Sequence, residues 1–212
     1  MKLKTLLALV TPMAFVASMA AAHDGSSHAE PNKLLTNTAV TAQPNGAEQK
    51  ARQYFTDLPV VTQDGQQLRF FSDVLKDRVV LISLFYTNCK EACPLTTDKL
   101  AQVQDQLQDD LGRDFFMVSI TLDPEHDTPE ILKRYADKFA PKEGWLFLTG
   151  EKQILSEITR RLGHTTDQIE AHNVQYMIGN VKIARWAKIP PHLPAEIIAE
   201  RLRQMASYTA AN

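Results

Sequence analysis

The chain has 212 residues, of which 44% are hydrophobic and 23% are charged. This balance is typical of one compact globular domain with extensions, and it excludes a fibrous, wholly disordered or multi-spanning membrane chain. The formal net charge is only -2 and neither sign forms a long block, so neither a nucleic acid nor an anionic membrane surface is indicated as a partner.

The first 22 residues have the pattern of a secretory signal peptide. Lys2 and Lys4 precede an apolar stretch, Leu6–Met19, and the small residues Ala20–Ala22 follow. Export machinery recognises this order of a basic end, a short apolar helix and small side chains. We therefore predict an exported, periplasmic protein with a signal peptide at 1–22. The alternative is an uncleaved anchor that keeps the N-terminus in the membrane.

A flexible polar tether is predicted for residues 23–49. This segment contains two glycines and two prolines, and it has no sustained apolar periodicity. Its histidines, His23 and His28, are weak candidates for metal binding, and a solvated tail is the simpler interpretation. The folded domain is predicted to span residues 50–208, followed by a short C-terminal tail at 209–212.

The domain is expected to open with a hairpin and a buried strand. Leu58–Gln63 and Gln66–Phe71 flank Asp64–Gly65, a pair that suits a tight turn. Val79–Tyr86 is an almost unbroken run of β-branched, apolar and aromatic residues, too short for a typical helix. Such a run predicts a central strand that is buried on both faces.

Helices and strands are predicted to alternate after this strand, as an α/β sheet with parallel strands requires. The order predicts an α/β, thioredoxin-like fold: a central, mostly parallel sheet flanked by helices, with an added N-terminal β-hairpin. The predicted elements are a helix at Leu95–Leu111, a strand at Phe115–Leu122, helices at Thr128–Phe139 and Ile154–Leu162, a hairpin of Val174–Ile178 and Val181–Trp186 around Gly179–Asn180, and a helix at Pro194–Met205.

Cys89 and Cys93 are the only cysteines, and they lie at a predicted strand-to-helix junction. A disulfide across so short a loop would constrain the unfolded chain little, so the pair suits chemistry better than stapling. Cysteines four apart share a helix face, and a helix N-terminus favours the thiolate. Two thiolates select soft metals, and copper(I) or zinc with one added imidazole would make a three-coordinate site.

Six histidines are available as a further ligand. His172 is the best placed, because it precedes the predicted Val174 strand, and in a thioredoxin-like sheet the loop entering that strand abuts the cysteine turn. His126 lies in an acidic turn, and His164 and His192 lie in predicted loops, so they are weaker candidates.

Two aspartates, Asp123 and Asp127, resemble a paired acid site. Because they lie in a proline-rich turn before Thr128, we expect them to cap the helix that follows and to hold the loop. Catalysis by this pair is the less favoured interpretation.

Three ordered segments resemble the signatures of the Sco/SenC family. Phe85–Pro94 (FYTNCKEACP) is similar to the Cys-x-x-x-Cys-Pro motif of that family. Ser119–Glu130 (SITLDPEHDTPE) resembles a second signature, and Leu146–Gly150 (LFLTG) resembles a third. Together with His172, these matches cover nearly all of Tyr54–Tyr208.

The resemblance implies a function as well as a fold. Members of the family are thioredoxin-fold, membrane-anchored or exported proteins that bind copper through two cysteines and a histidine, and they help assemble the dinuclear copper centre of cytochrome c oxidase. It implies that Cys89, Cys93 and His172 hold a copper ion here. It also implies a partner: the cytochrome c oxidase subunit that carries the dinuclear copper site, or another exported cuproprotein.

Two further functions fit the same cysteines. A thiol–disulfide oxidoreductase would use Cys89 and Cys93 as a redox pair to reduce the cysteines of a metal-receiving partner, and it would itself need a thiol reductant. An oxidoreductase of this kind would be an enzyme, whereas a metallochaperone would not be one. A peroxidase is a weaker third hypothesis, because the peroxiredoxin threonine lies three residues before the attacking cysteine and Thr87 lies only two before Cys89.

Overall fold

The structure is a computed structural model that describes residues 46–90, 92–165 and 175–208. The chain divides into two compact units, Met1–Thr41 and Ala42–Asn212, and the described residues belong to the second. The predicted signal peptide, the tether up to residue 45 and the C-terminal tail lie outside the described residues. Within the described ranges, no helix is both long and apolar enough to cross a membrane.

The described chain begins with helix α1, Gly46–Phe55. The last four residues of the predicted tether, 46–49, are therefore helical, and this part of the prediction is wrong. The reason is tertiary: Phe55 and Ala51 pack into an apolar cluster, and the Lys76 ammonium lies 2.7 Å from a Glu48 carboxylate oxygen. The sequence of this segment is mostly polar, so it gives no local sign of these contacts with distant residues.

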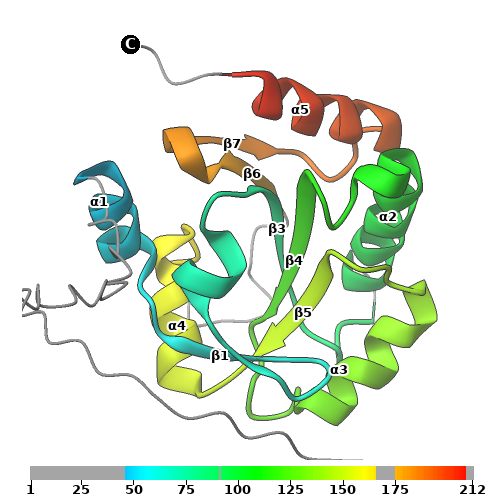
Figure 1. Ribbon diagram of the computed structural model, residues 1–212. Helices are drawn as coiled ribbons and strands as arrows, with labels where there is room; N and C mark the ends of the chain where they lie inside the picture. Colours follow the sequence, from blue (N-terminus) through cyan, green and yellow to red (C-terminus); the bar gives the residue numbers. More distant parts are fainter. Residues whose placement is uncertain (1–45, 91, 166–174, 209–212) are drawn as a thin grey trace, which may run out of the picture. The chain divides into compact units, whose positions relative to one another are not determined.

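Seven strands of the described chain form one sheet in the order β2-β1-β5-β4-β3-β6-β7 (Figure 1). In the described chain, five α-helices, three short 3-10 helices and one π-helical turn, Phe70–Leu75, surround it. The remaining elements are β1 Pro59–Thr62, β2 Gln67–Arg69, β3 Val79–Phe85, α2 Ala92–Leu107, β4 Phe115–Thr121, α3 Pro129–Ala136, β5 Trp145–Thr149, α4 Lys152–Arg161, β6 Tyr176–Asn180, β7 Arg185–Ile189 and α5 Ala195–Ser207.

Parallel pairing is confined to the centre of the sheet. β4 pairs in parallel with β3 and with β5, because the crossovers through α2 and α3 return the chain to the same edge. The other pairs, β1 with β2 and β5, β3 with β6, and β6 with β7, are antiparallel. The α/β prediction is confirmed, but the sheet is mixed rather than mostly parallel, since hairpins supply its edges.

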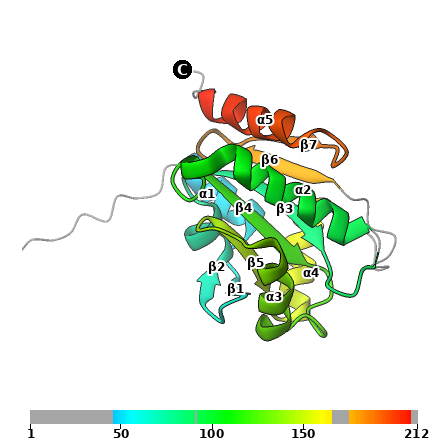
Figure 2. The same cartoon turned by 90° about the vertical axis from the view of Figure 1, so that its right-hand side faces the viewer.

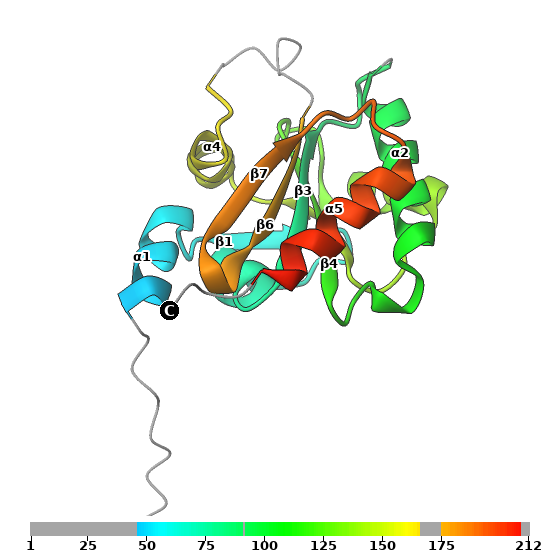
Figure 3. The ribbon, with the colours of Figure 1, turned by 90° about the horizontal axis from the view of Figure 1, so that it is seen from above.

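Helices cover both faces of the sheet. Helices α2, α3 and α5 lie on one face, and α1 and α4 lie on the other (Figures 2 and 3). Alternate residues of β3 supply the two cores: Leu81 and Phe85 pack under α2, whereas Val80 and Ile82 pack against the opposite cluster. The prediction of a strand buried on both faces is therefore confirmed.

The last hairpin turns later than the sequence predicts. Gly179 and Asn180 end β6 instead of forming the turn, and the chain reverses at Val181–Ala184. Gly179 lies opposite Trp186, and a Cβ at Gly179 would come within 2.3 Å of the Trp186 ring. The glycine therefore makes room for the indole, and it does not supply turn geometry.

Candidate functional site

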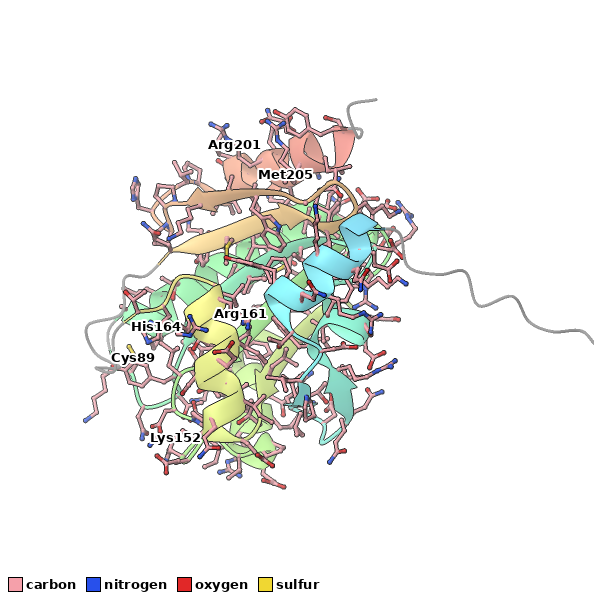
Figure 4. All side chains as sticks on the ribbon, turned by 90° about the vertical axis from the view of Figure 1, so that its left-hand side faces the viewer. Cys89, Lys152, Arg161, His164, Arg201 and Met205 are labelled. Carbon is pink, nitrogen blue, oxygen red and sulfur yellow. The ribbon has the colours of Figure 1, made fainter. Side chains whose placement is uncertain are left out.

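The two cysteines lie where the central strand β3 passes into α2. β3 ends at Phe85 and α2 begins at Ala92, so Cys89 belongs to the connection and Cys93 to the first helical turn. Figure 4 shows Cys89 at one end of the domain, the end at which His164 follows α4. Ligand sites in sheets of this kind usually form beyond the carboxyl ends of the parallel strands.

Cys89 and Cys93 do not form a disulfide with each other, and the backbone brings them together. The Cys93 N–H donates a hydrogen bond to the Cys89 Sγ at 3.2 Å, and the Cys89 N–H donates to the Tyr86 carbonyl at 3.3 Å. The Cys89 sulfur thus satisfies one of the unpaired N–H groups at the start of α2. The predicted position of the pair at a helix N-terminus is confirmed.

The two thiols differ in their exposure to solvent. Cys93 is 1% exposed, whereas Cys89 is partly exposed. Burial, together with the contact with Cys89, raises the pKa of Cys93 to about 12. The prediction that the helix N-terminus favours a thiolate is therefore wrong for Cys93, because burial removes the hydration of the charged form.

Two buried tyrosines hold the first turn of α2. The Thr97 hydroxyl donates to the Cys93 carbonyl at 2.8 Å, and its oxygen lies 2.9 Å from the Tyr135 hydroxyl. The Tyr176 hydroxyl donates to the Thr96 carbonyl at 2.6 Å. Side chains from α3 and from the start of β6 therefore fix the backbone that carries Cys93.

His172 lies outside the described residues. The described chain resumes at Gln175, and the hydrogen bond from Tyr176 to Thr96 brings the start of β6 to the first turn of α2. Tyr176 comes four positions after His172, and four residue steps of extended chain reach at most about 14 Å. The described ranges contain no cluster of three or more residues of metal-binding type. The structure brings Cys89 and Cys93 together, and the third ligand stays a prediction.

The remaining described histidines are His126, His164 and His192, and none of them belongs to a group of three or more residues of metal-binding type within the described ranges. His126 and His192 are exposed in the loops before α3 and α5. His164 lies just after α4, where its N–H donates to the Thr159 carbonyl at 2.9 Å. With His164, Thr159 and Lys152 help to line a surface cavity of about 420 Å³.

The two aspartates of the β4–α3 loop have different roles. Asp127 is completely buried and accepts hydrogen bonds from Thr87 and Thr121, so the expected role in holding the loop is confirmed for this residue. The helix cap was predicted wrongly: the Thr128 hydroxyl itself accepts from the Ile131 N–H at 3.4 Å. Spacing alone does not distinguish a capping residue from its neighbour.

Comparison with known proteins gives a family and a fold. A family model described as SCO1/SenC matches residues 46–206. An SCO2-like protein of Rickettsia prowazekii is 36% identical over 90 residues, which are 42% of this chain and 42% of the relative. The chain thus matches less than half the length of this curated relative.

Solved structures resemble the described domain at low sequence identity. The copper-bound ScoI of Bradyrhizobium japonicum has a TM-score of 0.59 and 21% identity, covering 69% of this chain and 96% of its own. BsSco, described as a member of the Sco family of cytochrome c oxidase assembly proteins, has a TM-score of 0.61 and 22% identity, covering 72% and 92%. These similarities confirm the predicted thioredoxin-like α/β fold.

Proposed function

Because the chain belongs to the SCO1/SenC family, we propose that it is a metallochaperone that binds one copper ion through Cys89 and Cys93 and transfers it to a partner. The hydrogen bond from the Cys93 N–H to the Cys89 Sγ carries this proposal, since it keeps both cysteines at the same helix start. The copper reported for Bradyrhizobium ScoI supports the choice of metal.

The chemistry of the two cysteines fits a soft metal. Thiolates bind copper(I) strongly, and a metal cation stabilises the charged form that burial makes unfavourable at Cys93. Cys89 is partly exposed, which suits a site from which the ion must leave by ligand exchange. We propose His172 as the third ligand, because the start of β6 lies against the first turn of α2.

Membership of the SCO1/SenC family supports a proposal for the recipient of the copper ion. We propose that the ion goes to the dinuclear copper site of cytochrome c oxidase or to another exported cuproprotein. The description of BsSco as a cytochrome c oxidase assembly protein supports the first choice. The signal-peptide pattern of residues 1–22 supports action in the periplasm.

A thiol–disulfide oxidoreductase is the second candidate function. The observation in its favour is the asymmetry of the pair: Cys89 is accessible to a partner disulfide, and Cys93 is buried behind it. An exposed attacking thiol with a neighbouring resolving thiol is the arrangement that dithiol exchange requires. Both functions use the sulfurs of Cys89 and Cys93. They differ in their need for His172, because copper binding would use it as a ligand and dithiol exchange would not.

Copper titration of the reduced, full chain tests the proposal. The Cys89→Ser and His172→Ala variants remove proposed ligands, and His192→Ala is the matched control, since His192 is an exposed loop histidine outside the proposed site. A disulfide-reduction assay runs on the same samples. Removing a ligand from a three-coordinate site should weaken binding by at least tenfold.

A chaperone predicts tight, near-stoichiometric binding that both ligand variants lose and His192→Ala keeps. An oxidoreductase predicts weak binding that is indifferent to His172, together with rapid dithiol turnover that Cys89→Ser abolishes. The second result would contradict the copper proposal and leave the redox function in its place.

A further inference from the structure

Asp127 is a buried carboxylate that joins the cysteine loop to the sheet. Its side chain is 0% exposed. One of its oxygens accepts from the Thr87 hydroxyl, and the other accepts from the Thr87 N–H at 3.1 Å and from the Thr121 hydroxyl. Thr87 lies two residues before Cys89, and Thr121 is the last residue of β4. The carboxylate therefore ties the loop to the end of a central strand.

Within the described chain, the Asp127 carboxylate accepts its hydrogen bonds from neutral groups of two threonines. Burying a carboxylate is costly unless several hydrogen bonds replace its hydration, and an apolar side chain would fill the same space at lower cost. Packing alone therefore does not account for an acid at this position. What the acid adds is two directed hydrogen bonds to one residue, Thr87, including one to its backbone.

Those two bonds act on the segment that places Cys89. Holding both the N–H and the hydroxyl of Thr87 fixes the direction in which the chain leaves β3. One residue earlier in the chain, the Tyr86 carbonyl accepts from the Cys89 N–H, and the Cys89 sulfur in turn accepts from the Cys93 N–H. The hydrogen bonds at Thr87 and those at the two cysteines are thus linked through the peptide bond between Tyr86 and Thr87.

We propose that Asp127 is a positioning residue for the dithiol, and that it acts through Thr87 to hold the Cys89 sulfur close to Cys93. The inference deepens the proposed function, and it rests on the assignment of the cysteine pair as the working site. Asp127 would raise the effective concentration of one thiol at the other. A high effective concentration favours both the binding of a metal by the pair and the formation of a disulfide.

Exchange with glutathione measures this effective concentration directly. The protein dithiol and one oxidised glutathione give the protein disulfide and two reduced glutathiones, so one S–S bond forms as one breaks. Asp127→Asn keeps the side-chain volume but replaces one acceptor oxygen by an NH₂ group that cannot accept. We expect the equilibrium constant of the full chain to fall at least threefold. Thr87→Val should lower it less, because the backbone hydrogen bond remains.

Asp123→Asn is the matched control, because Asp123 lies in the same loop and its hydrogen bonds to His126, Asp127 and Thr121 are made by its main-chain groups. Circular dichroism at the assay temperature establishes that each variant is folded. Lower constants in Asp127→Asn and Thr87→Val, with an unchanged constant in Asp123→Asn, support the proposal. Folded Asp127→Asn with the wild-type constant overturns it, and so does an equal shift in Asp123→Asn.

Should Asp127→Asn fail to fold, Thr87→Val decides: a lowered constant supports the proposal and a wild-type constant overturns it. Copper titration of the same samples separates the two proposals. A wild-type chain that does not bind copper contradicts the metallochaperone function. The glutathione equilibrium would then still test whether Asp127 positions the two thiols.

Discussion

The backbone N–H of Cys93 donates a hydrogen bond to the sulfur of Cys89 at 3.2 Å, although the two residues differ sharply in exposure. The contact places the partly exposed sulfur of Cys89 against the first turn of α2, where the Cys93 side chain is shielded from water. Hydration therefore sets the chemical difference between two otherwise identical side chains.

Alkylation by iodoacetamide should distinguish the two thiols of the reduced chain. The thiolate is the nucleophile, and a raised pKa leaves Cys93 almost entirely protonated at neutral pH. We expect Cys89 to react first. The Cys93 rate should keep rising with pH beyond 10, whereas in the urea-unfolded chain it should level off near the ordinary thiol pKa of about 8.5. Peptide mass spectrometry reads both sites, and equal rates in the folded chain would contradict the burial argument.

Copper affinity should rise with pH, because binding displaces thiol protons. Cys93 remains protonated throughout the neutral range, so each tenfold fall in proton concentration should tighten apparent binding about tenfold for the proton lost at this residue. Competition with a copper(I) chelator from pH 6 to 8 measures this slope, after correction for the titration of the chelator. Cys93→Ser should reduce the slope by about one unit. A pH-independent affinity in the wild type would rule out Cys93 as a ligand.

Tyr135→Phe should weaken the first turn of α2 without unfolding the domain. The substitution removes the hydroxyl that meets Thr97, whose own hydroxyl donates to the Cys93 carbonyl. The loss of one buried hydrogen bond should cost about 1 kcal/mol in the free energy of unfolding, measured with urea. Tyr208→Phe is the control, since Tyr208 is 42% exposed, and it should change stability by less than about 0.5 kcal/mol. Equal effects would mean that the buried contact contributes nothing specific.

Gly144→Ala should destabilise the sheet strongly. Gly144 has a φ of +94°, and a Cβ there would lie 2.3 Å from the Gly112 nitrogen. Left-handed strain costs about 1 to 2 kcal/mol, and the backbone clash adds to it, so we expect a loss above about 2 kcal/mol. Gly65→Ala separates the two causes, because Gly65 has a φ of +79° with open space around it. Thermal unfolding should show the smaller loss for Gly65→Ala; matching losses would exclude the clash.

Local pattern identifies the elements whose burial is regular. The apolar run at Val79–Tyr86 corresponds to β3, Asp64–Gly65 lies between β1 and β2, and the cysteines lie at the junction before α2. The strand β5 was not assigned from periodicity, because its five residues form a short apolar run that sequence alone does not separate from other buried segments.

Errors arose where distant contacts decide the conformation. Helix α1 extends into the predicted tether because Phe55 packs in a core formed by later residues. Gly179 ends a strand because Trp186 covers it. The ionisation of Cys93 was misjudged for the same reason: a helix N-terminus can be read from sequence, but the protein atoms that remove water cannot.

The sequence by itself determined the chemistry of this protein, since side-chain identity and spacing are local properties: two cysteines four apart, a proline after the second, and ordered signatures that indicate a family. Only the tertiary structure decided which of the two thiols is shielded from water, which tyrosines hold the helix start, and that Asp127 reaches Thr87 across 40 residues of chain. Burial and hydrogen bonding depend on the whole fold, because they are set by atoms that are close in space and distant in sequence.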